Sequence, residues 1–508
     1  MLTRLQGALL AQFTTSQRRA NLVLLGLGAL SALALPPLHV LPALFLAIPA
    51  LLAAIEAAPT PRAAGRFGWW FGFGLNFLGL YWITEAILVE AARYWWLVPL
   101  AVPALAACLA FFVALPVALV KYTKAGWARV VGLAGAWTLT DIARQFTLSG
   151  FPWNLWGTVW AIPGELGDVL LQPAALIGVH GLGLFTLLLA GLPMLGRRGL
   201  PVGLLVIVGW AGFGLWRLHQ PEQAAPGHHV VLVQGNVPQG EKWDRARAVE
   251  IFSLYLRLTA TGVAGVAGGP VIVVWPEAAS PFPLEPDQNA RLAIASAASG
   301  HPVLATSVRW DAAGRPRNSI IPVLAGGALG DIYDKWHLVP FGEVQPPWFP
   351  LPIQLVPGGG FAPGPGPRTM YVHGVPPFGP LICYEAIFSG QIVDRANRPV
   401  WLVNVTNDAW FGNSAGPYQH LAAARLRAVE EGLPVLRAAN TGISAAYDGF
   451  GRELVRLGLG QSGVVSVKLP GTLPPPYFAR WGWPFSLLLA LSVLTLSLVK
   501  RRIPRSHS

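Results

Sequence analysis

Residues 378–388 read FGPLICYEAIF, in which an apolar run leads into Cys383, Tyr384 and Glu385. A short, nearly continuous apolar run with turn residues before it predicts a strand that is buried on both faces of a sheet. A thiol at the end of such a strand can be a nucleophile, and the backbone N–H that follows it can bind an oxyanion. This stretch therefore indicates both the fold class of its surroundings and a candidate site.

Seven further apolar runs between residues 225 and 470 have the same character. They are 229–237, 270–279, 302–310, 318–326, 399–408, 434–442 and 463–469. Helical patterns are found at 244–264, 287–299, 388–397 and 417–431. Buried strands combined with helices predict an α/β domain with a central mixed sheet that helices cover. Because strands and helices do not alternate regularly, we expect a layered sandwich and not an eightfold barrel.

The remainder of the chain is unusually apolar. Of the 508 residues, 53% are hydrophobic and only 12% are charged. Stretches of about 20 apolar residues are long enough to cross a hydrocarbon layer of about 30 Å as helices. We find eight such stretches, at 20–35, 38–58, 68–89, 97–120, 128–143, 168–195, 200–217 and 484–499. The composition excludes a purely soluble enzyme, a disordered protein and a fibre, and it predicts a multi-span α-helical membrane protein with eight transmembrane helices.

The formal net charge of +12 is distributed unevenly. Residues 218–480 hold 19 Lys and Arg against 18 Asp and Glu, so the positive excess belongs to the apolar part and does not indicate a nucleic-acid partner. In the apolar part, 14 basic residues fall on one side of the predicted spans and only 3 on the other, namely Arg93, Arg144 and Arg217. Since basic residues near span ends stay in the cytoplasm during insertion, we expect a cytoplasmic N-terminus and an extracytoplasmic segment at 218–480.

These patterns divide the chain into three parts. A membrane domain with seven transmembrane helices covers 1–217, the extracytoplasmic α/β domain covers 218–480, and the last helix with a basic cytoplasmic tail covers 481–508. Two segments have two interpretations each. Residues 1–34 contain either a retained first span or a cleaved signal peptide, and the later topology is the same in both cases. Residues 345–367, rich in Pro and Gly, are either a lid over the site or a disordered linker.

Three residues at or near predicted strand ends could carry chemistry. Cys383 is one of two cysteines, and a disulfide is implausible because the other, Cys108, lies inside a predicted span. Glu277 follows an apolar strand and could accept a proton. Lys335 lies in a stretch dense in aromatic residues and could stabilise a thiolate or an oxyanion. Each also has a plainer interpretation: an inert buried thiol, a carboxylate at a helix N-terminus and a solvated amine.

The order of these motifs resembles the Glu–Lys–Cys triad of the nitrilase superfamily. Trp-Pro-Glu ending at Glu277 comes first, Lys335 with Leu-Val-Pro-Phe-Gly-Glu at 338–343 comes second, and Cys-Tyr-Glu at 383–385 comes third. With eight spans and the domain inserted before the last of them, the chain resembles the apolipoprotein N-acyltransferase family over nearly its whole length. Further runs that match this family are 234–236 with 242–243, 404–412, 416–417 and 419–420.

The resemblance implies a two-step acyl transfer that needs neither a metal nor an organic cofactor. Cys383 would take an acyl chain from a membrane phospholipid as a thioester and pass it to the α-amine of the lipid-modified N-terminal cysteine of an apolipoprotein. Glu277 would move the protons, and Lys335 with the N–H of Tyr384 would hold the oxyanion. The family pattern further marks Glu343, Tyr384 and Glu385 as supporting residues and Trp243 and Phe341 as residues that shape the substrate path.

The same resemblance implies a place in the cell and a set of partners. The protein would lie in the inner membrane of a bacterium, with its α/β domain on the periplasmic side. Its partners would be a phospholipid acyl donor and a diacylglyceryl-modified apolipoprotein acceptor, both of them lipids held in the bilayer. We expect a monomer, because the site must admit two lipids from the membrane.

Three other functions remain open at this point. A membrane-tethered amidase or nitrilase would use the same triad on small amides or nitriles. A serine hydrolase is suggested by residues 412–416, which fit G-x-S-x-G. However, the six residues 407–412 come between the preceding strand and the tight run around Ser414, whereas a nucleophile elbow follows its strand directly. A transporter or a lipoprotein-binding scaffold would not need an intact triad, and inverted repeats are not apparent in the hydropathy.

Overall fold

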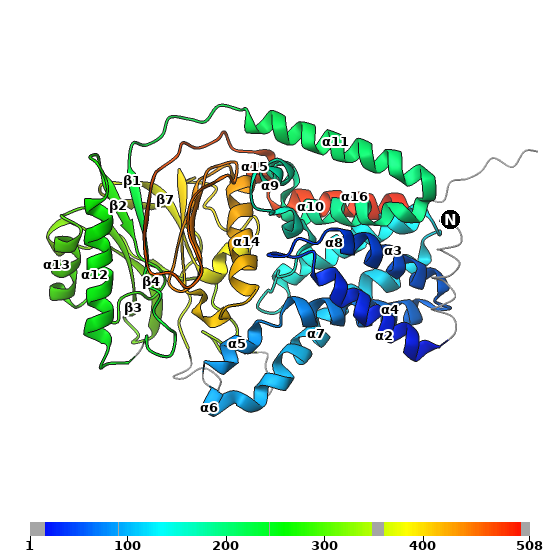
Figure 1. Ribbon diagram of the computed structural model, residues 1–508, viewed down its shortest axis with the longest axis horizontal. Coiled ribbons are helices and arrows are strands. Elements are labelled where there is room, and N and C mark those ends of the chain that lie inside the picture. The colour runs from blue at the N-terminus through cyan, green and yellow to red at the C-terminus, as the bar shows by residue number, and fades with distance from the viewer. Residues whose placement is uncertain (1–15, 90, 243, 348–359, 499–508) are drawn as a thin grey trace, which may run out of the picture.

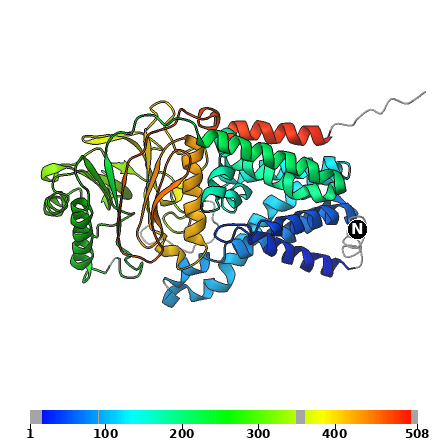
Figure 2. The same ribbon diagram turned by 45° about the horizontal axis from the view of Figure 1, so that its top comes forward.

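The computed structural model describes residues 16–89, 91–242, 244–347 and 360–498, and it has two halves, one helical and one built of strands and helices (Figures 1 and 2). The main helices of the helical half are α2 (Gln17–Ala32), α3 (Pro42–Ala57), α4 (Pro61–Gly79), α7 (Val98–Leu119), α8 (Trp127–Phe146), α10 (Ala174–Gly191), α11 (Gly199–Leu218) and α16 (Trp483–Leu498). Each of the eight predicted spans overlaps one of these helices. Arg4 and the basic tail at 500–508, which contribute to the predicted topology, lie outside the described residues.

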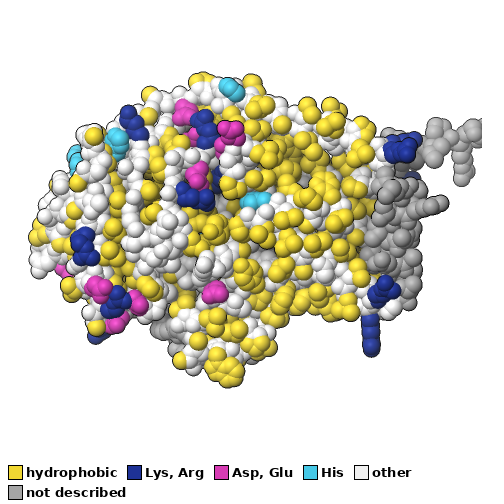
Figure 3. Space-filling model, in the orientation of Figure 1, with side chains coloured by type: hydrophobic (Ala, Val, Ile, Leu, Met, Phe, Trp, Pro, Cys, Tyr) yellow, Lys and Arg dark blue, Asp and Glu magenta, His cyan; other side chains and the backbone are white. Residues whose placement is uncertain are grey.

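The outward surface of the helical half is apolar. Leu115, Leu205 and Leu496 are 64%, 74% and 69% exposed although they belong to long helices, and hydrophobic side chains are spread over this half in Figure 3. Soluble monomers rarely expose contiguous apolar patches larger than a few hundred Å². Among the described residues, the helical runs 95–122 and 174–218 are long and apolar enough to cross a membrane, and α3 and α16 are shorter apolar helices. The number of crossings and their direction stay predictions.

The other half is a four-layered sandwich. It contains two six-stranded sheets, with the orders β12-β1-β2-β3-β4-β5 and β11-β10-β9-β8-β7-β6. The strands are β1 (His229–Gln234), β2 (Val271–Val274), β3 (Val303–Trp310), β4 (Pro316–Val323), β5 (Tyr333–Asp334), β6 (Met370–Val372), β7 (Val375–Ile382), β8 (Trp401–Thr406), β9 (Val435–Ala439), β10 (Ser444–Tyr447), β11 (Glu453–Leu457) and β12 (Gly463–Lys468). Side chains such as Leu232 and Trp401 form the core between the two sheets.

Helices cover both outer faces of the sandwich. α12 (Ala248–Ala264) and α13 (Gln288–Ala297) pack on the first sheet, and α14 (Gly416–Glu431) packs on the second. α14 also faces the helical half, so it lies between the two halves of the molecule (Figure 1). The central strands β1, β2 and β3 run parallel in the first sheet, as do β7, β8 and β9 in the second. The carboxyl ends of parallel strands lie at the same edge of a sheet, which is where polar groups can converge.

The layered sandwich is confirmed, and each of the eight predicted runs contains a strand. The strands form two sheets where the sequence suggested one, because an apolar run indicates burial on both faces but not which strands pair. The predicted helix at 388–397 is wrong. The Asp394 side chain there accepts hydrogen bonds from the N–H groups of Ala396 and Asn397, a turn that competes with helix formation. The predicted lid at 345–367 lies mostly outside the described residues.

A seam of buried contacts joins α14 to the helical half. The Gln419 Oε1 atom accepts hydrogen bonds from the indole N–H groups of Trp82 (3.0 Å) and Trp153 (2.7 Å). Farther along the helix, the Arg425 guanidinium pairs with the Asp168 carboxylate at 2.6 Å. These contacts fix the second sheet, and the strand ends it carries, relative to the helical half.

A third contact of the seam lies at a break in α10. Gly178 has φ 63 and ψ −179, values that an α-helix does not contain, so the helix is interrupted there. The N–H of Val179, which follows the break, donates to the Glu430 carboxylate at 2.7 Å. The Ser389 hydroxyl donates to the same carboxylate at 2.8 Å. A side chain of α14 therefore caps a helix of the other half.

Candidate active site

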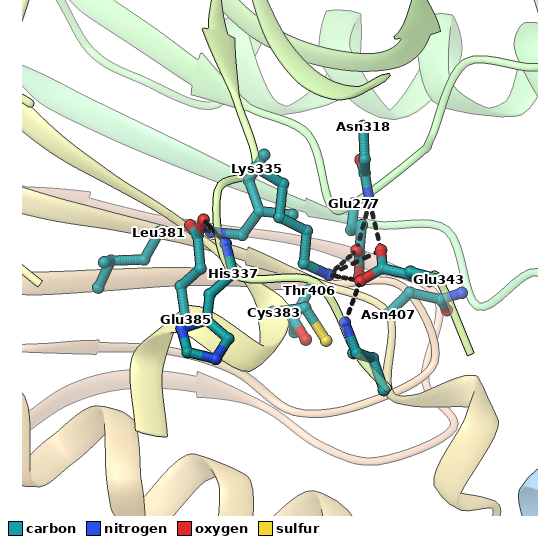
Figure 4. A network of polar contacts seen from close by, with 12 residues as sticks. Glu277, Asn318, Lys335, His337, Glu343, Leu381, Cys383, Glu385, Thr406 and Asn407 are labelled. Atoms are coloured by element: carbon teal, nitrogen blue, oxygen red, sulfur yellow. Dashed lines mark hydrogen bonds and ion pairs between the residues drawn. The ribbon is translucent and has the colours of Figure 1, made fainter. Parts of the chain in front are cut away.

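Glu277, Lys335 and Cys383 lie together, as the order of their motifs predicts (Figure 4). Each follows a strand: Glu277 comes after β2, Lys335 after β5, and Cys383 after β7. The side chains of all three are almost fully buried, with exposed fractions of 6%, 1% and 7%. Figure 4 shows the sulfur of Cys383 on the side of the Lys335 amine and the Glu277 carboxylate. The carboxylate, the amine and the thiol therefore lie together in one buried place, although their strands belong to two different sheets.

The Lys335 ammonium lies between two carboxylates. Its Nζ atom is 3.1 Å from Glu277 Oε1 and 2.8 Å from the Glu343 carboxylate. The Asn318 amide bridges the same two groups, since its Nδ2 atom donates to Glu277 at 2.7 Å and to Glu343 at 3.2 Å. Glu343 is held in turn by the N–H of Val339 at 2.9 Å. The sequence predicted Glu343 as a supporting residue, and the structure places it in contact with Lys335.

These contacts set the charges of the resting site. Burial alone would raise the pKa of Glu277, but Lys335 and Lys242 outweigh burial and hold that pKa below its usual value. Burial would lower the pKa of Lys335, yet Glu277 and Glu343 raise it well above its usual value. Burial and the nearby Glu277 carboxylate raise the pKa of the Cys383 thiol. The resting site therefore holds an ionised carboxylate, an ammonium and a neutral thiol, which is the state that a general base requires.

A second lysine, Lys242, binds the backbone of Glu277. The Lys242 Nζ atom donates to the backbone oxygen of Glu277 at 2.7 Å, and the side chain is buried. Burial lowers the pKa of this amine to about 8. Lys242 had no predicted role, because 35 residues separate it from Glu277 and only the fold brings the two together. Trp243, predicted as a substrate contact, lies outside the described residues.

Cys383 begins a short 3₁₀ helix, η7 (Cys383–Ile387), at the end of β7. Its φ angle is 50°, in the left-handed region that residues with a Cβ atom rarely occupy. The first N–H groups of a helix have no acceptor within it, so the N–H of Tyr384 is available to an oxyanion beside the sulfur. The oxyanion role of that N–H group stays a prediction.

Glu385 holds the turn that carries Cys383. Its carboxylate accepts hydrogen bonds from the N–H groups of Ile382 and Trp336, both at 2.7 Å, and from the Tyr333 hydroxyl at 3.1 Å. Burial raises the pKa of Glu385 to about 7. The side chain does not contact Lys335 directly in the way that Glu343 does. It joins the segment before Cys383 to the segment after Lys335 and so supports the geometry of both.

The helical half forms one wall of the site. The Tyr384 hydroxyl donates to the carbonyl oxygen of Gly150 at 2.6 Å, and the Tyr384 ring lies near the Phe151 ring, with centroids 6.5 Å apart. His337 Nε2 is 2.9 Å from the carbonyl oxygen of Ser149. The residue predicted to shape the substrate path, Phe341, lies in the turn that leads to Glu343 and has a φ of 63°. Its predicted role is not decided by this placement.

Ser414, the candidate nucleophile of the rival serine hydrolase interpretation, is part of a turn. Its hydroxyl donates to the carbonyl oxygen of Phe411 at 2.6 Å and accepts from the N–H of Gly416 at 3.1 Å. Both bonds are local and prepare the start of α14. Cys108 and Cys383 are both free, in agreement with the predicted absence of a disulfide. Within the described part of the chain, we find no group of His, Cys, Asp and Glu side chains with the spacing of a metal site.

Comparisons with known proteins cover both halves of the chain. Residues 27–192 match the family described as Apolipoprotein N-acyltransferase N-terminal domain, and residues 230–473 match the family described as Carbon-nitrogen hydrolase. The Apolipoprotein N-acyltransferase of Rhodopseudomonas palustris is 38% identical over 526 residues, 96% of each chain. That of Bradyrhizobium diazoefficiens is 38% identical over 547 residues, 99% of each chain. The structure of a Saccharomyces cerevisiae member of branch 10 of the nitrilase superfamily is 17% identical, with a TM-score of 0.38 over 49% of this chain and 93% of that chain.

Proposed function

The chain belongs to the apolipoprotein N-acyltransferase family, and we propose that Cys383 carries the acyl group as a thioester between a phospholipid donor and the lipoprotein acceptor. The protein is an acyltransferase of lipoprotein N-acylation, with a domain of the carbon-nitrogen hydrolase family. The observation that carries the proposed mechanism is the buried cluster of Glu277, Lys335 and Glu343 beside the Cys383 sulfur.

In the first step, the Glu277 carboxylate takes the proton of the Cys383 thiol as the sulfur attacks the ester carbonyl of a phospholipid. The negative charge that forms on the carbonyl oxygen is stabilised by the Lys335 ammonium and the N–H of Tyr384. When the tetrahedral intermediate collapses, the carbon–oxygen bond breaks and the leaving alkoxide takes the proton from Glu277. The products are a Cys383 thioester and a lysophospholipid.

In the second step, the α-amine of the diacylglyceryl-modified N-terminal cysteine attacks the thioester. Glu277 accepts a proton from the attacking amine, and the same two groups stabilise the oxyanion. The carbon–sulfur bond breaks, the proton on Glu277 returns to the Cys383 sulfur, and an amide is released. Glu277 thus needs a low pKa in the resting site, since it must start each step as a carboxylate.

The supporting residues act on this cluster. Glu343 keeps Lys335 charged and orients its Nζ atom, because its carboxylate lies 2.8 Å from that atom. Glu385 holds the turn around Cys383 through the N–H groups of Ile382 and Trp336. Trp243 and Phe341 would contact the acyl chains, an assignment that rests on the family pattern.

We place the protein in the bacterial inner membrane as a monomer with eight crossings. The membrane domain covers 1–217 and the last helix and tail cover 481–508, with the catalytic domain at 218–480 on the periplasmic side. The exposed leucines of the helical half and the one-sided distribution of basic residues support this arrangement. Both substrates carry lipid chains, so in this arrangement they would reach the site from the bilayer.

The direct test is the mass of the enzyme after its first half-reaction. The purified protein in detergent is incubated with a phospholipid and no acceptor, and its intact mass is measured. We expect an increase equal to one fatty acyl group, located on Cys383, removed by hydroxylamine and absent from the Cys383→Ala variant. If no adduct forms with any phospholipid while small amides or nitriles are hydrolysed, the enzyme would be a membrane-tethered amidase and the proposed mechanism would be wrong.

A further inference from the structure

A second buried network contacts the backbone of the candidate nucleophile through the Cys383 carbonyl oxygen. His420, on α14, places its Nε2 atom 3.0 Å from the carbonyl oxygen of Cys383 and its Nδ1 atom 2.9 Å from Asp408 Oδ1. A carbonyl oxygen can only accept a hydrogen bond, so the Nε2 atom carries a proton and donates it, and the Nδ1 atom of the neutral ring faces the Arg437 Nη2 donor at 3.3 Å. Both side chains are about 1% exposed. The imidazole is therefore a buried donor that is fixed on the backbone of the candidate nucleophile.

Arg437, on β9, organises this network through both ends of its guanidinium. Its Nη2 atom pairs with Asp408 Oδ2 at 2.6 Å, and its Nη1 atom donates to Asn404 Oδ1 at 2.5 Å. The Asn404 amide then donates to the carbonyl oxygen of Leu381 at 3.1 Å. The hydrogen bonds through His420 and through Asn404 thus end at the carbonyl oxygens of Cys383 and Leu381, the two residues that flank Ile382. A network of this extent, buried and hydrogen-bonded throughout, fixes the turn at the end of β7.

The turn needs to be held because Cys383 is strained. A φ of 50° is unfavourable for a residue with a Cβ atom, and such a conformation persists only where the surroundings enforce it. The peptide unit that joins Cys383 to Tyr384 is planar, and in its trans form the carbonyl and the N–H point in opposite directions. A hydrogen bond at the Cys383 carbonyl oxygen therefore fixes the direction of the Tyr384 N–H. It also polarises the peptide unit and makes that N–H a stronger donor.

We propose that Asp408 and His420 are positioning residues that aim the Tyr384 N–H at the oxyanion of each acyl-transfer step by holding the Cys383 carbonyl. Arg437 Nη2 lies against the Nδ1 atom of the imidazole, and Asp408 holds that guanidinium in place at 2.6 Å while Arg437 keeps Asp408 ionised. The proposal rests on the proposed function, since it requires Cys383 to be the acyl carrier. It assigns a role to two runs of the sequence, 404–412 and 419–420, that the triad does not use.

Two reactions of Cys383 separate this role from a merely structural one. Thioester formation passes through an oxyanion, whereas alkylation by iodoacetamide displaces iodide and forms none. In the full-length protein in detergent, His420→Phe keeps a ring between Trp153 and Phe411 but removes the donor. We expect the kcat of thioester formation to fall about 100-fold, the size of one lost oxyanion donor, with the KM for phospholipid unchanged and the alkylation rate within about twofold.

A second pair of variants covers the case in which His420→Phe does not fold. His420→Gln can place an amide N–H near the former Nε2 atom, whereas His420→Asn is too short to reach it, so we expect the Gln variant to form the thioester about tenfold faster or more. The proposal would be overturned by any of three results. These are equal rates of thioester formation in His420→Gln and His420→Asn, an unchanged rate in His420→Phe, and rates of alkylation and thioester formation that fall by the same factor. If the wild-type protein forms no thioester, the proposed function itself would be overturned. Cys383→Ala is the negative control for the thioester measurement.

Discussion

Replacing Gln419 by Leu tests whether the seam between the halves depends on one amide. The substitution keeps the size of the side chain but removes the oxygen that accepts from the Trp82 and Trp153 indoles at 3.0 and 2.7 Å. Both indoles are about 5% exposed or less, so water cannot replace the lost acceptor. Each buried donor left without a partner costs about 1–3 kcal/mol, which gives about 2–6 kcal/mol for the pair.

For a folding unit of about 250 residues, 1 kcal/mol lowers the midpoint of thermal unfolding by about 2 °C, so we expect a fall of about 4–12 °C. Differential scanning calorimetry in detergent measures it, with Gln288→Leu as the matched control because Gln288 is exposed at the start of α13. If Gln419→Leu melts no lower than Gln288→Leu, the indole hydrogen bonds do not hold the seam and this reasoning is wrong.

Three further predictions concern the site and the broken helix. Glu343→Gln removes the negative charge 2.8 Å from the Lys335 amine. Since a hydrogen bond to a charged group is lost, thioester formation should slow about 10- to 100-fold without a change in the KM for phospholipid. Mass spectrometry of quenched reactions measures the rate, and an unchanged rate would contradict this prediction. As the pH rises through about 8, Lys242 loses the charge that favours the Cys383 thiolate, so the rate should fall there in the wild type but not in Lys242→Met. On the acid side, the pKa of Glu277 is held below its usual value by Lys335 and Lys242, so the rate should stay constant until the pH falls below the usual range of a glutamate; identical pH profiles of the wild type and Lys242→Met would refute the role of Lys242. Gly178→Ala would place a Cβ atom 2.2 Å from the Phe478 ring, on a residue whose φ is 63°, and should lower the melting temperature. The control Gly209→Ala should not lower it, because no atom lies within 4 Å of the added Cβ atom; equal melting temperatures of the two variants would contradict the prediction.

Glu277 and Cys383 could be singled out from the sequence because each follows an apolar strand, whereas Lys335 was marked by a low-charge stretch dense in aromatic residues. β2 and β7, which precede Glu277 and Cys383, are parallel strands, and the carboxyl ends of such strands lie where polar groups converge. The strand before Lys335, β5, has only two residues and pairs antiparallel with β4, so its part in the cluster depends on the fold. Asn318 could not be found this way, since it lies inside β4 in a run that reads as an ordinary strand. Its amide gains a role only because the fold sets it between Glu277 and Glu343.

His420 and Asp408 illustrate a second limit. Both belong to runs that match the family, yet nothing local to either run indicates a hydrogen bond to the Cys383 carbonyl 37 residues away. The break at Gly178 was equally hidden, because a glycine inside an apolar helical stretch is common and costs little. The helical half could be divided into its helices by apolar length alone, while the pairing of strands into two sheets depends on contacts that no single run contains.

The capped break in α10 sets an order of assembly. The N–H of Val179 receives its acceptor from Glu430, a residue that the ribosome adds 251 positions later. Synthesis proceeds at about 5–20 residues per second, so α10 leaves the ribosome many seconds before its cap exists. The break in α10 therefore gains its acceptor only after the sandwich has folded against the helical half, so the last hydrogen bond of this helix depends on the folding of the neighbouring domain.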